Sequence, residues 1–207
     1  TKKGIMMDPK FNHLRIHTEY SLRDGIVQIS ALIEKAVADG MPAVAITDQS
    51  NLFGTVKFYK EALDAGIKPI IGVDLWLHNE KNLKQPFRLT VLCQNNTGYK
   101  NLLVLISKSF IEGQTQEKAV IQYDWLAECS EGLIALSGEK EGDLGQAILQ
   151  NDTAQLETLR NFYERHFATR YYIELQRTGH PGEEKYIQAA LAYAELHQLP
   201  VLSLIHI

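Results

Sequence analysis

Short apolar runs alternate regularly with longer amphipathic segments along this 207-residue chain, and this alternation limits the folds that it can adopt. The first amphipathic segment has an apolar face made up of Ile29, Leu32, Ile33, Ala36 and Val37. Gly40 ends this expected helix, and Pro42 prevents its continuation. The apolar run at residues 43–47 is too short for a helix and is typical of a strand buried on both faces.

The same unit repeats along the chain. Seven runs are strand candidates, at residues 11–17, 43–47, 68–77, 87–93, 132–137, 171–176 and 200–205. Helices are expected at residues 29–37, 56–65, 99–110, 144–149, 154–167 and 184–197. This alternation predicts a parallel sheet with right-handed crossovers. Seven strands in a chain of this length favour a closed or nearly closed barrel over an open Rossmann sheet, and no GxGxxG motif follows the first strand.

Composition excludes several classes of protein. The formal net charge is -4, so no general basic field would attract a nucleic-acid backbone. The two cysteines, Cys93 and Cys129, form neither a disulfide framework nor a CxxC zinc motif, which favours a reducing, cytoplasmic setting. No apolar run approaches the roughly 20 residues of a membrane span, so we expect no contact with a membrane.

The two ends of the chain look different from its middle. Residues 1–10 are expected to be a leader outside the native domain, since Met7 is a more natural start than Thr1. Residues 11–207 are expected to form one domain that is incomplete at its C-terminal end, because the last strand candidate has no helix or loop after it.

Polar side chains follow several of the strand candidates. His17, Asp48, Asp74 and Glu139 all stand at or just past the end of a strand, where α/β barrels place their functional residues. The stretch HLRIHTEYSLRDG at residues 13–25 combines histidines, acids and turn residues, which is typical of a site for a divalent cation. An arginine, however, stands where another imidazole would be expected.

Five stretches of the chain carry a family resemblance. They are HLRIHTEYSLRDG, AITDQSNLFGTVKFYKEALDAGIKPIIGVD, LTVLCQNNTGYKNLLVLISKSF, GLIALSG and YYIELQRTG. From about residue 11 to residue 201 the chain resembles the PHP (polymerase and histidinol phosphatase) domain, and more narrowly the PHP domains at the N-terminus of bacterial DNA polymerase III alpha subunits. The phrases TDQSNLFG and NTGYKNL are specific to this branch. The resemblance implies a distorted, TIM-like (β/α)7 barrel, truncated here at its C-terminal end.

The resemblance also implies which positions held metal ions in active relatives, where the metal cluster hydrolyses phosphate esters or proofreads DNA ends. His17 and Asp24 match ligands of the family, while Asp74 stands in place of a glutamate and Glu139 in place of a cysteine. Three further ligand positions are substituted, by Arg15, Gln49 and Arg88. The Asp-x-His pair that follows the last strand of the family is missing from residues 202–207.

The two arginines at ligand positions, Arg15 and Arg88, determine whether a metal ion could bind. Arginine stays charged at every relevant pH, cannot donate a lone pair and repels divalent cations. We therefore predict a degenerate metal site in which Arg15 and Arg88 pair with some of Asp24, Asp74 and Glu139. No catalytic or cofactor-binding residue, and no cofactor, is expected in this chain. For Asp48 we expect a structural role, as a cap for the turn before Asn51, and no chemical one.

The resemblance implies a role for the chain within a larger protein. The parent would be a DNA-directed DNA polymerase that uses magnesium, DNA and deoxynucleotides through domains absent from these residues. This part would be an inactive scaffold that docks the proofreading exonuclease subunit within the polymerase III holoenzyme. The alternatives are an active metal-dependent PHP phosphoesterase or 3′–5′ exonuclease, and a free-standing relative of histidinol phosphatase. Metal content and the length of the parent reading frame discriminate between them.

Overall fold

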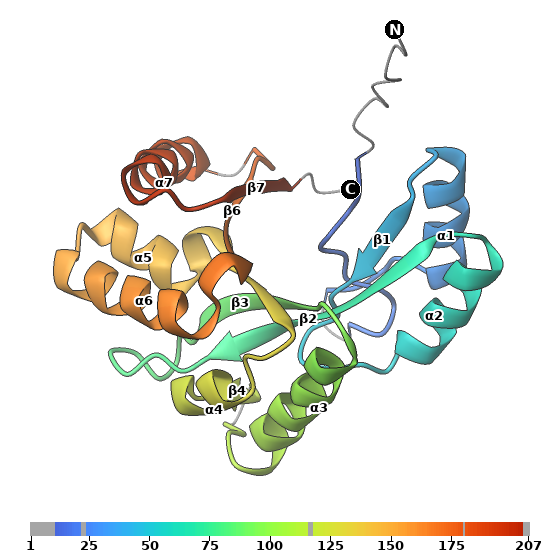
Figure 1. The fold of residues 1–207 in the computed structure, drawn as a ribbon, viewed down its shortest axis with the longest axis horizontal. Helices are drawn as coiled ribbons and strands as arrows, with labels where there is room; N and C mark the ends of the chain where they lie inside the picture. Colours follow the sequence, from blue (N-terminus) through green and yellow to red (C-terminus); the bar gives the residue numbers. More distant parts are fainter. Residues whose placement is uncertain (1–10, 22–23, 116–117, 180, 205–207) are drawn as a thin grey trace, which may run out of the picture.

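A computed structural model describes residues 11–21, 24–115, 118–179 and 181–204. It contains a seven-stranded sheet that curls into a half-barrel with helices on its outer side (Figure 1). The strands are β1 (Ala43–Ile46), β2 (Lys68–Leu77), β3 (Phe87–Cys93), β4 (Val120–Ile121), β5 (Leu133–Leu136), β6 (Tyr171–Gln176) and β7 (Val201–Leu204). The helices are α1 (Ile29–Ala38), α2 (Thr55–Asp64), α3 (Asn96–Ile111), α4 (Tyr123–Glu128), α5 (Asp143–Gln150), α6 (Thr153–His166) and α7 (Glu183–His197). The predicted fold class, a distorted barrel, is confirmed.

The prediction of an all-parallel sheet is wrong at β3. The strand order is β1-β2-β3-β5-β6-β7, with β4 paired to β2. Strand β3 runs antiparallel to both of its neighbours, while the other pairs are parallel. The physical reason is the connection at residues 78–86, which is shorter than the dozen or so residues that a crossover helix needs. Strand β4 and helix α4 lie in a stretch where the sequence predicted neither.

The first predicted strand, at residues 11–17, is not a regular strand. This segment runs beside β1, where the Ala45 N–H donates to the carbonyl of His13 and the Thr47 N–H donates to the carbonyl of Ile16, each over 2.8 Å. The Ile16 N–H instead donates to the Thr47 side-chain hydroxyl over 3.1 Å, so a side chain takes the place of a ladder partner. Neighbouring residues of an extended segment face opposite ways. Ile16 therefore joins the core under α1, and Arg15 points into the half-barrel.

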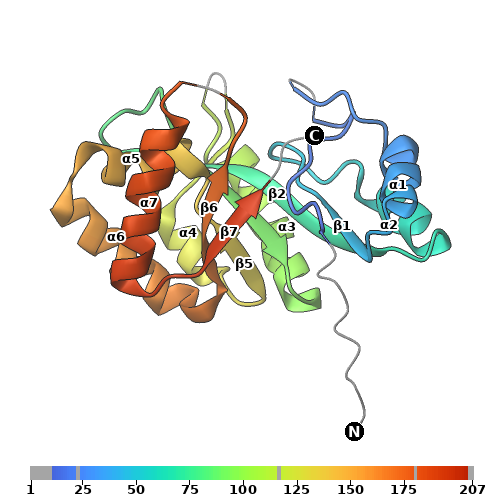
Figure 2. The same ribbon diagram turned by 90° about the horizontal axis from the view of Figure 1, so that it is seen from above.

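Two of the three hydrophobic clusters among the described residues hold most of the elements together. The larger one lies between strands β2, β3, β5 and β6 and helices α3 to α7, and the smaller one joins α1, α2 and β1. Figure 2 shows these elements from above, with α1, α2 and β1 on one side and α4 to α7 on the other. Close backbone packing fixes α3, because a Cβ on Gly98 would lie 1.8 Å from the carbonyl oxygen of Gly132. The Asn95 side chain accepts from the Gly98 N–H and caps the helix. The motif NTGYKNL is thus a helix start pressed against the turn before β5. None of the described helices could cross a membrane.

Candidate functional site

The guanidinium of Arg15 lies at the centre of a buried cluster of acidic side chains inside the half-barrel. Its Nε is 2.8 Å from Asp74 Oδ2, and one terminal nitrogen is 3.3 Å from both Glu139 Oε1 and Glu174 Oε1. The same nitrogen donates to the side-chain oxygen of Gln176 over 3.3 Å. The partners come from β2, from β6 and from the turn after β5, so three segments distant in sequence converge on one cation. The predicted pairing of Arg15 with Asp74 and Glu139 is confirmed.

Asp74 is the most heavily bonded acid of the cluster. It accepts hydrogen bonds from Arg15, from His17 Nε2 over 2.8 Å and from the Thr90 hydroxyl over 2.5 Å. Burial by itself would raise the pKa of Asp74, but the charge of Arg15 and the hydrogen bond from His17 outweigh burial and hold the pKa well below its usual range. Asp74 is therefore a fixed negative charge with no solvent exposure.

His17 lies between two carboxylates. Its Nε2 is 2.8 Å from Asp74 Oδ2, and its Nδ1 is 2.9 Å from Asp24 Oδ2. The Ser21 hydroxyl donates to the other oxygen of Asp24 over 2.7 Å. Burial lowers the pKa of His17, but the hydrogen bond to Asp74 and the two negative charges raise it by more. The expected ligands His17, Asp24 and Asp74 are thus brought together, and they bond to one another.

Positive charge in the cluster does not balance the negative charge. Arg15 is shared by Asp74, Glu139 and Glu174, all of them buried. Burial raises the pKa of Glu139, and it raises the pKa of Glu174 to about 7 against the attraction of Arg15. The Oε2 atom of Glu174 has no hydrogen-bond partner among the described residues. Glu174 therefore keeps its proton to a higher pH than an exposed glutamate does.

Arg88 takes a different partner from the ones predicted. Its terminal nitrogen is 2.7 Å from Glu141 Oε2, at the rim of the cluster, and it forms no ion pair with Asp24, Asp74 or Glu139 among the described residues. The reason is the 3-10 turn Glu139–Glu141, which follows β5 and lays its last residue over Arg88. Only the first of the two arginines thus lies inside the cluster.

Gln49 and Asp48 hold the loop after β1. The Gln49 side-chain amide donates to the backbone carbonyl of Asp74 over 2.7 Å. Asp48 accepts from the backbone N–H of Thr18 over 2.6 Å and from its hydroxyl over 2.8 Å. The expectation that Asp48 caps the turn before Asn51 is wrong, because both oxygens of its carboxylate accept from Thr18, and the Ser50 N–H in that turn donates to the carbonyl of Asp74 instead. Asp48 instead ties the loop after residue 17 to β1.

The donor set can be tested for its fit to a metal cluster. Carboxylates and an imidazole are suitable ligands, but the guanidinium of Arg15 already lies among Asp74, Glu139 and Glu174. A divalent cation there would meet a fixed positive charge within hydrogen-bond distance of its ligands. Among the described residues, no group of three or more His, Cys, Asp or Glu side chains is arranged to hold a metal ion. The residues present do not fit a metal cluster.

Sequence reasoning missed Glu174 and Gln176, although β6 carries a signal for them. In the strand sequence YYIELQ, Glu174 is fully buried while its neighbours Ile173 and Leu175 pack in the hydrophobic core on the other face. An acid within an otherwise apolar strand indicates a buried partner of opposite charge. This partner is Arg15, 159 residues away in sequence.

Comparison with known proteins places this geometry in a family. The model of the PHP domain matches residues 13–178. The chain is similar to DNA polymerase III alpha subunits from Vibrio cholerae and Escherichia coli K12, each 48% identical over 198 residues, and from Pseudomonas fluorescens, 45% identical over 197 residues. These matches cover 96%, 96% and 95% of this chain but 17% of each relative, so the chain spans about a sixth of their length.

Solved structures share the fold at low sequence identity. An amidohydrolase from Chromobacterium violaceum has a TM-score of 0.57 and 12% identity, covering 93% of this chain and 86% of that one. A two-domain protein from Bacteroides vulgatus that contains a predicted PHP-like metal-dependent phosphoesterase has a TM-score of 0.55 and 15% identity, covering 94% of this chain and 51% of that one. Together with the family match over residues 13–178, the curled sheet and the cluster at its strand ends lead to one conclusion: the chain belongs to the PHP domain family.

Proposed function

We propose that the chain is the N-terminal PHP region of a replicative DNA polymerase III alpha subunit and acts there as a scaffold without hydrolytic activity. The chain is 48% identical to two such subunits over 96% of its own length, and this similarity supports the assignment. DNA synthesis, with its DNA, deoxynucleotides and magnesium, would belong to the rest of the subunit, in the cytoplasm.

The observation that carries the proposal is the position of Arg15. Loss of metal binding requires a physical cause. The guanidinium of Arg15 is bonded to Asp74, Glu139 and Glu174, and its positive charge would repel a divalent cation there. The same ion pairs tie the N-terminal segment to β2 and β6, which suits a structural role. A domain without hydrolytic chemistry would contribute by stabilising the polymerase and by docking the proofreading exonuclease subunit.

Metal content tests the loss of hydrolytic chemistry. The purified protein is incubated with manganese or zinc, dialysed, and analysed for bound metal and for metal-dependent hydrolysis of a phosphate monoester and of a DNA 3′ end. We expect substoichiometric metal and no hydrolysis. Stoichiometric metal together with hydrolysis would establish the alternative, an active phosphoesterase or 3′–5′ exonuclease.

Complex formation tests the scaffold role. The full-length alpha subunit and a version without residues 11–204 are each mixed with the exonuclease subunit and analysed by sedimentation. We expect a complex with the full-length subunit only. Retention of the complex by the shortened subunit, when that subunit still copies DNA, would contradict docking through this domain.

A further inference from the structure

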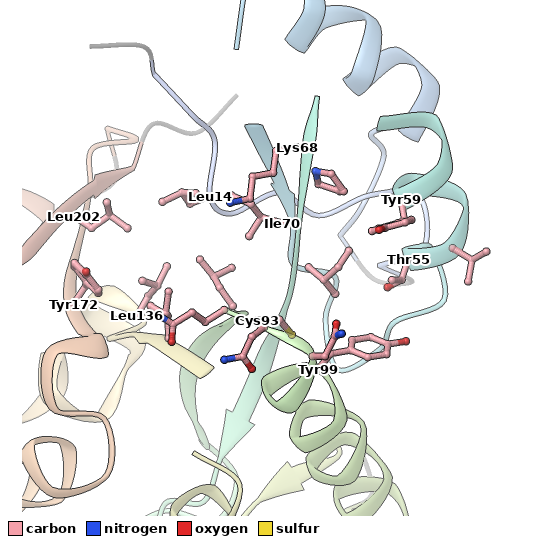
Figure 3. Close-up of a pocket in the computed structure, with 18 of the residues that line it drawn as sticks. Leu14, Thr55, Tyr59, Lys68, Ile70, Cys93, Tyr99, Leu136, Tyr172 and Leu202 are labelled. Carbon is pink, nitrogen blue, oxygen red and sulfur yellow. The ribbon is translucent and has the colours of Figure 1, made fainter. Parts of the chain in front are cut away.

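A cavity of about 790 Å³ lies on the inner side of the half-barrel and extends to α2. Its size falls within the range of small-molecule sites. The residues of the Arg15 cluster do not line it. Figure 3 shows the cavity reaching from Leu136 and Tyr172 on one side, past Ile70, to Tyr59 and Tyr99 on the other.

Most of the cavity wall is apolar. Leu14, Ile70, Leu92, Leu136 and Tyr172 form the part that faces the barrel interior. Leu14, Ile70 and Tyr172 are only partly buried although they belong to a hydrophobic cluster. Transfer of apolar surface from water into such a space is favourable, so this part of the cavity suits a hydrocarbon chain or an aromatic ring.

One buried polar atom in the wall lacks a partner. Thr55, the first residue of α2, is 7% exposed, and its hydroxyl oxygen forms no hydrogen bond among the described residues. Buried hydroxyl groups in proteins are nearly always hydrogen-bonded, so this one is available to a ligand. Asn95, the N-cap of α3, also lines the cavity. The start of α2 has no side-chain cap, and its partial positive charge favours an anion, whereas at the start of α3 the Asn95 side chain already accepts from the Gly98 N–H.

The charged groups around the cavity have one sign. Lys60 and Lys68 line it and are exposed, and neither forms an ion pair among the described residues. Lys57, on the same helix as Lys60, is by contrast paired with Glu19. No acidic side chain is among the described residues of the cavity wall, although the chain as a whole carries a net charge of -4.

We propose that this cavity binds an amphipathic monoanion, of the class of aliphatic or aromatic carboxylates. The apolar part lies against Leu92, Leu136 and Tyr172, the carboxylate accepts a hydrogen bond from the Thr55 hydroxyl, and Lys60 and Lys68 balance its charge. This site is separate from the Arg15 cluster and does not depend on the function proposed above.

Calorimetric titration of the full chain tests the proposal with three probes. Decanoate, used below its micelle-forming concentration, carries both features, decanol lacks the charge, and acetate lacks the apolar part. We expect decanoate to bind at least about tenfold more tightly than decanol, the effect of a charge-assisted hydrogen bond, and acetate not to bind. Added salt weakens decanoate binding only.

Two variants and their matched controls locate the head group. Thr55→Val keeps the side-chain shape but removes the hydroxyl, and Lys68→Met removes a charge at the cavity wall. Each is expected to reduce the preference for decanoate over decanol several-fold. Thr158→Val on α6 and Lys100→Met on α3, which lie outside the cavity wall, are expected to leave that preference unchanged.

Three results would overturn the proposal. Equal affinity for decanoate and decanol would mean a nonspecific apolar surface. An equal effect of Lys68→Met and Lys100→Met would mean only a diffuse charge effect. No binding of decanoate by the chain, when circular dichroism shows it to be folded, would mean that the cavity is not a site for such anions.

Discussion

Arg15 and Asp74 form a buried ion pair in which Nε lies 2.8 Å from Oδ2, with side chains that are 5% and 0% exposed. The pair joins the irregular N-terminal segment to the middle of β2, 59 residues away in sequence. Because Asp74 also accepts hydrogen bonds from His17 and Thr90, the pair links the N-terminal segment to both β2 and β3.

Replacing Arg15 should strongly destabilise the protein. In Arg15→Met the carboxylates of Asp74, Glu139 and Glu174 lose their shared cation, and breaking a buried pair typically costs about 3–5 kcal/mol. Urea unfolding measures the loss. The control is Arg160→Met, which removes an exposed pair with Glu164 and should change stability by less than about 1 kcal/mol. Equal stability of the two variants would contradict the buried cluster.

Arg88 should matter much less than Arg15. Its partner Glu141 is half exposed, so Arg88→Met is expected to cost about 0–1 kcal/mol in the same urea experiment. Reversal of the charge at its partner, Glu141→Lys, should give a loss of similar size. A cost for Arg88→Met as large as that for Arg15→Met would place Arg88 inside the cluster, as the sequence had suggested.

Restoring a metal site should require several changes at once. Arg15→His alone should lower the melting temperature and gain nothing from manganese or zinc, since Gln49 still supplies no imidazole and Arg88 remains charged nearby. The triple variant Arg15→His, Gln49→His and Arg88→His should melt at a higher temperature with metal than without it, because a ligand that binds only the folded state stabilises it. Metal-dependent stabilisation of the single variant would show that Arg15 was the only obstacle.

Stability should fall as the pH rises toward neutrality, and Glu174 should cause part of this fall. Burial raises the pKa of Glu174 to about 7, above its unfolded value of 4.5. Its contribution is therefore fully present below about pH 4.5 and is lost as the pH rises through about 7. Glu174→Gln should reduce the slope of unfolding free energy against pH in this window. The slope should not vanish, because the raised pKa of His17 acts in the same direction. An unchanged slope in the variant would contradict the assignment.

A second buried carboxylate gives an independent test of the larger hydrophobic cluster. Asp143 is fully buried at the start of α5 and accepts hydrogen bonds from the hydroxyls of Tyr123 and Tyr163 over 2.8 and 2.7 Å. Tyr163→Phe should cost about 1.5–3 kcal/mol, the value of a hydrogen bond to a charged group. The control is Tyr193→Phe, since that hydroxyl makes only a 3.5 Å contact with a backbone carbonyl. Equal unfolding free energies for the two variants would contradict this role of Asp143.

The order of residues alone predicts the barrel class and most of its elements. The bounds predicted for β2, β3 and β6 agree with the structure, because these strands are largely buried and form nearly continuous apolar runs. It also indicated that a fixed cation replaces a metal ligand at Arg15, because the chemistry of arginine does not depend on its surroundings.

The strand directions and the partner of each charge depend instead on how the elements pack. The antiparallel direction of β3 follows from a short connection, and the irregular path of residues 11–17 follows from a hydrogen bond to the Thr47 side chain. The contact of Arg15 with Glu174, and that of Arg88 with Glu141, depend on how distant segments converge. Local sequence encodes burial and periodicity, but ion pairing depends on distances of a few ångströms between residues far apart in the chain, which only the packed fold sets.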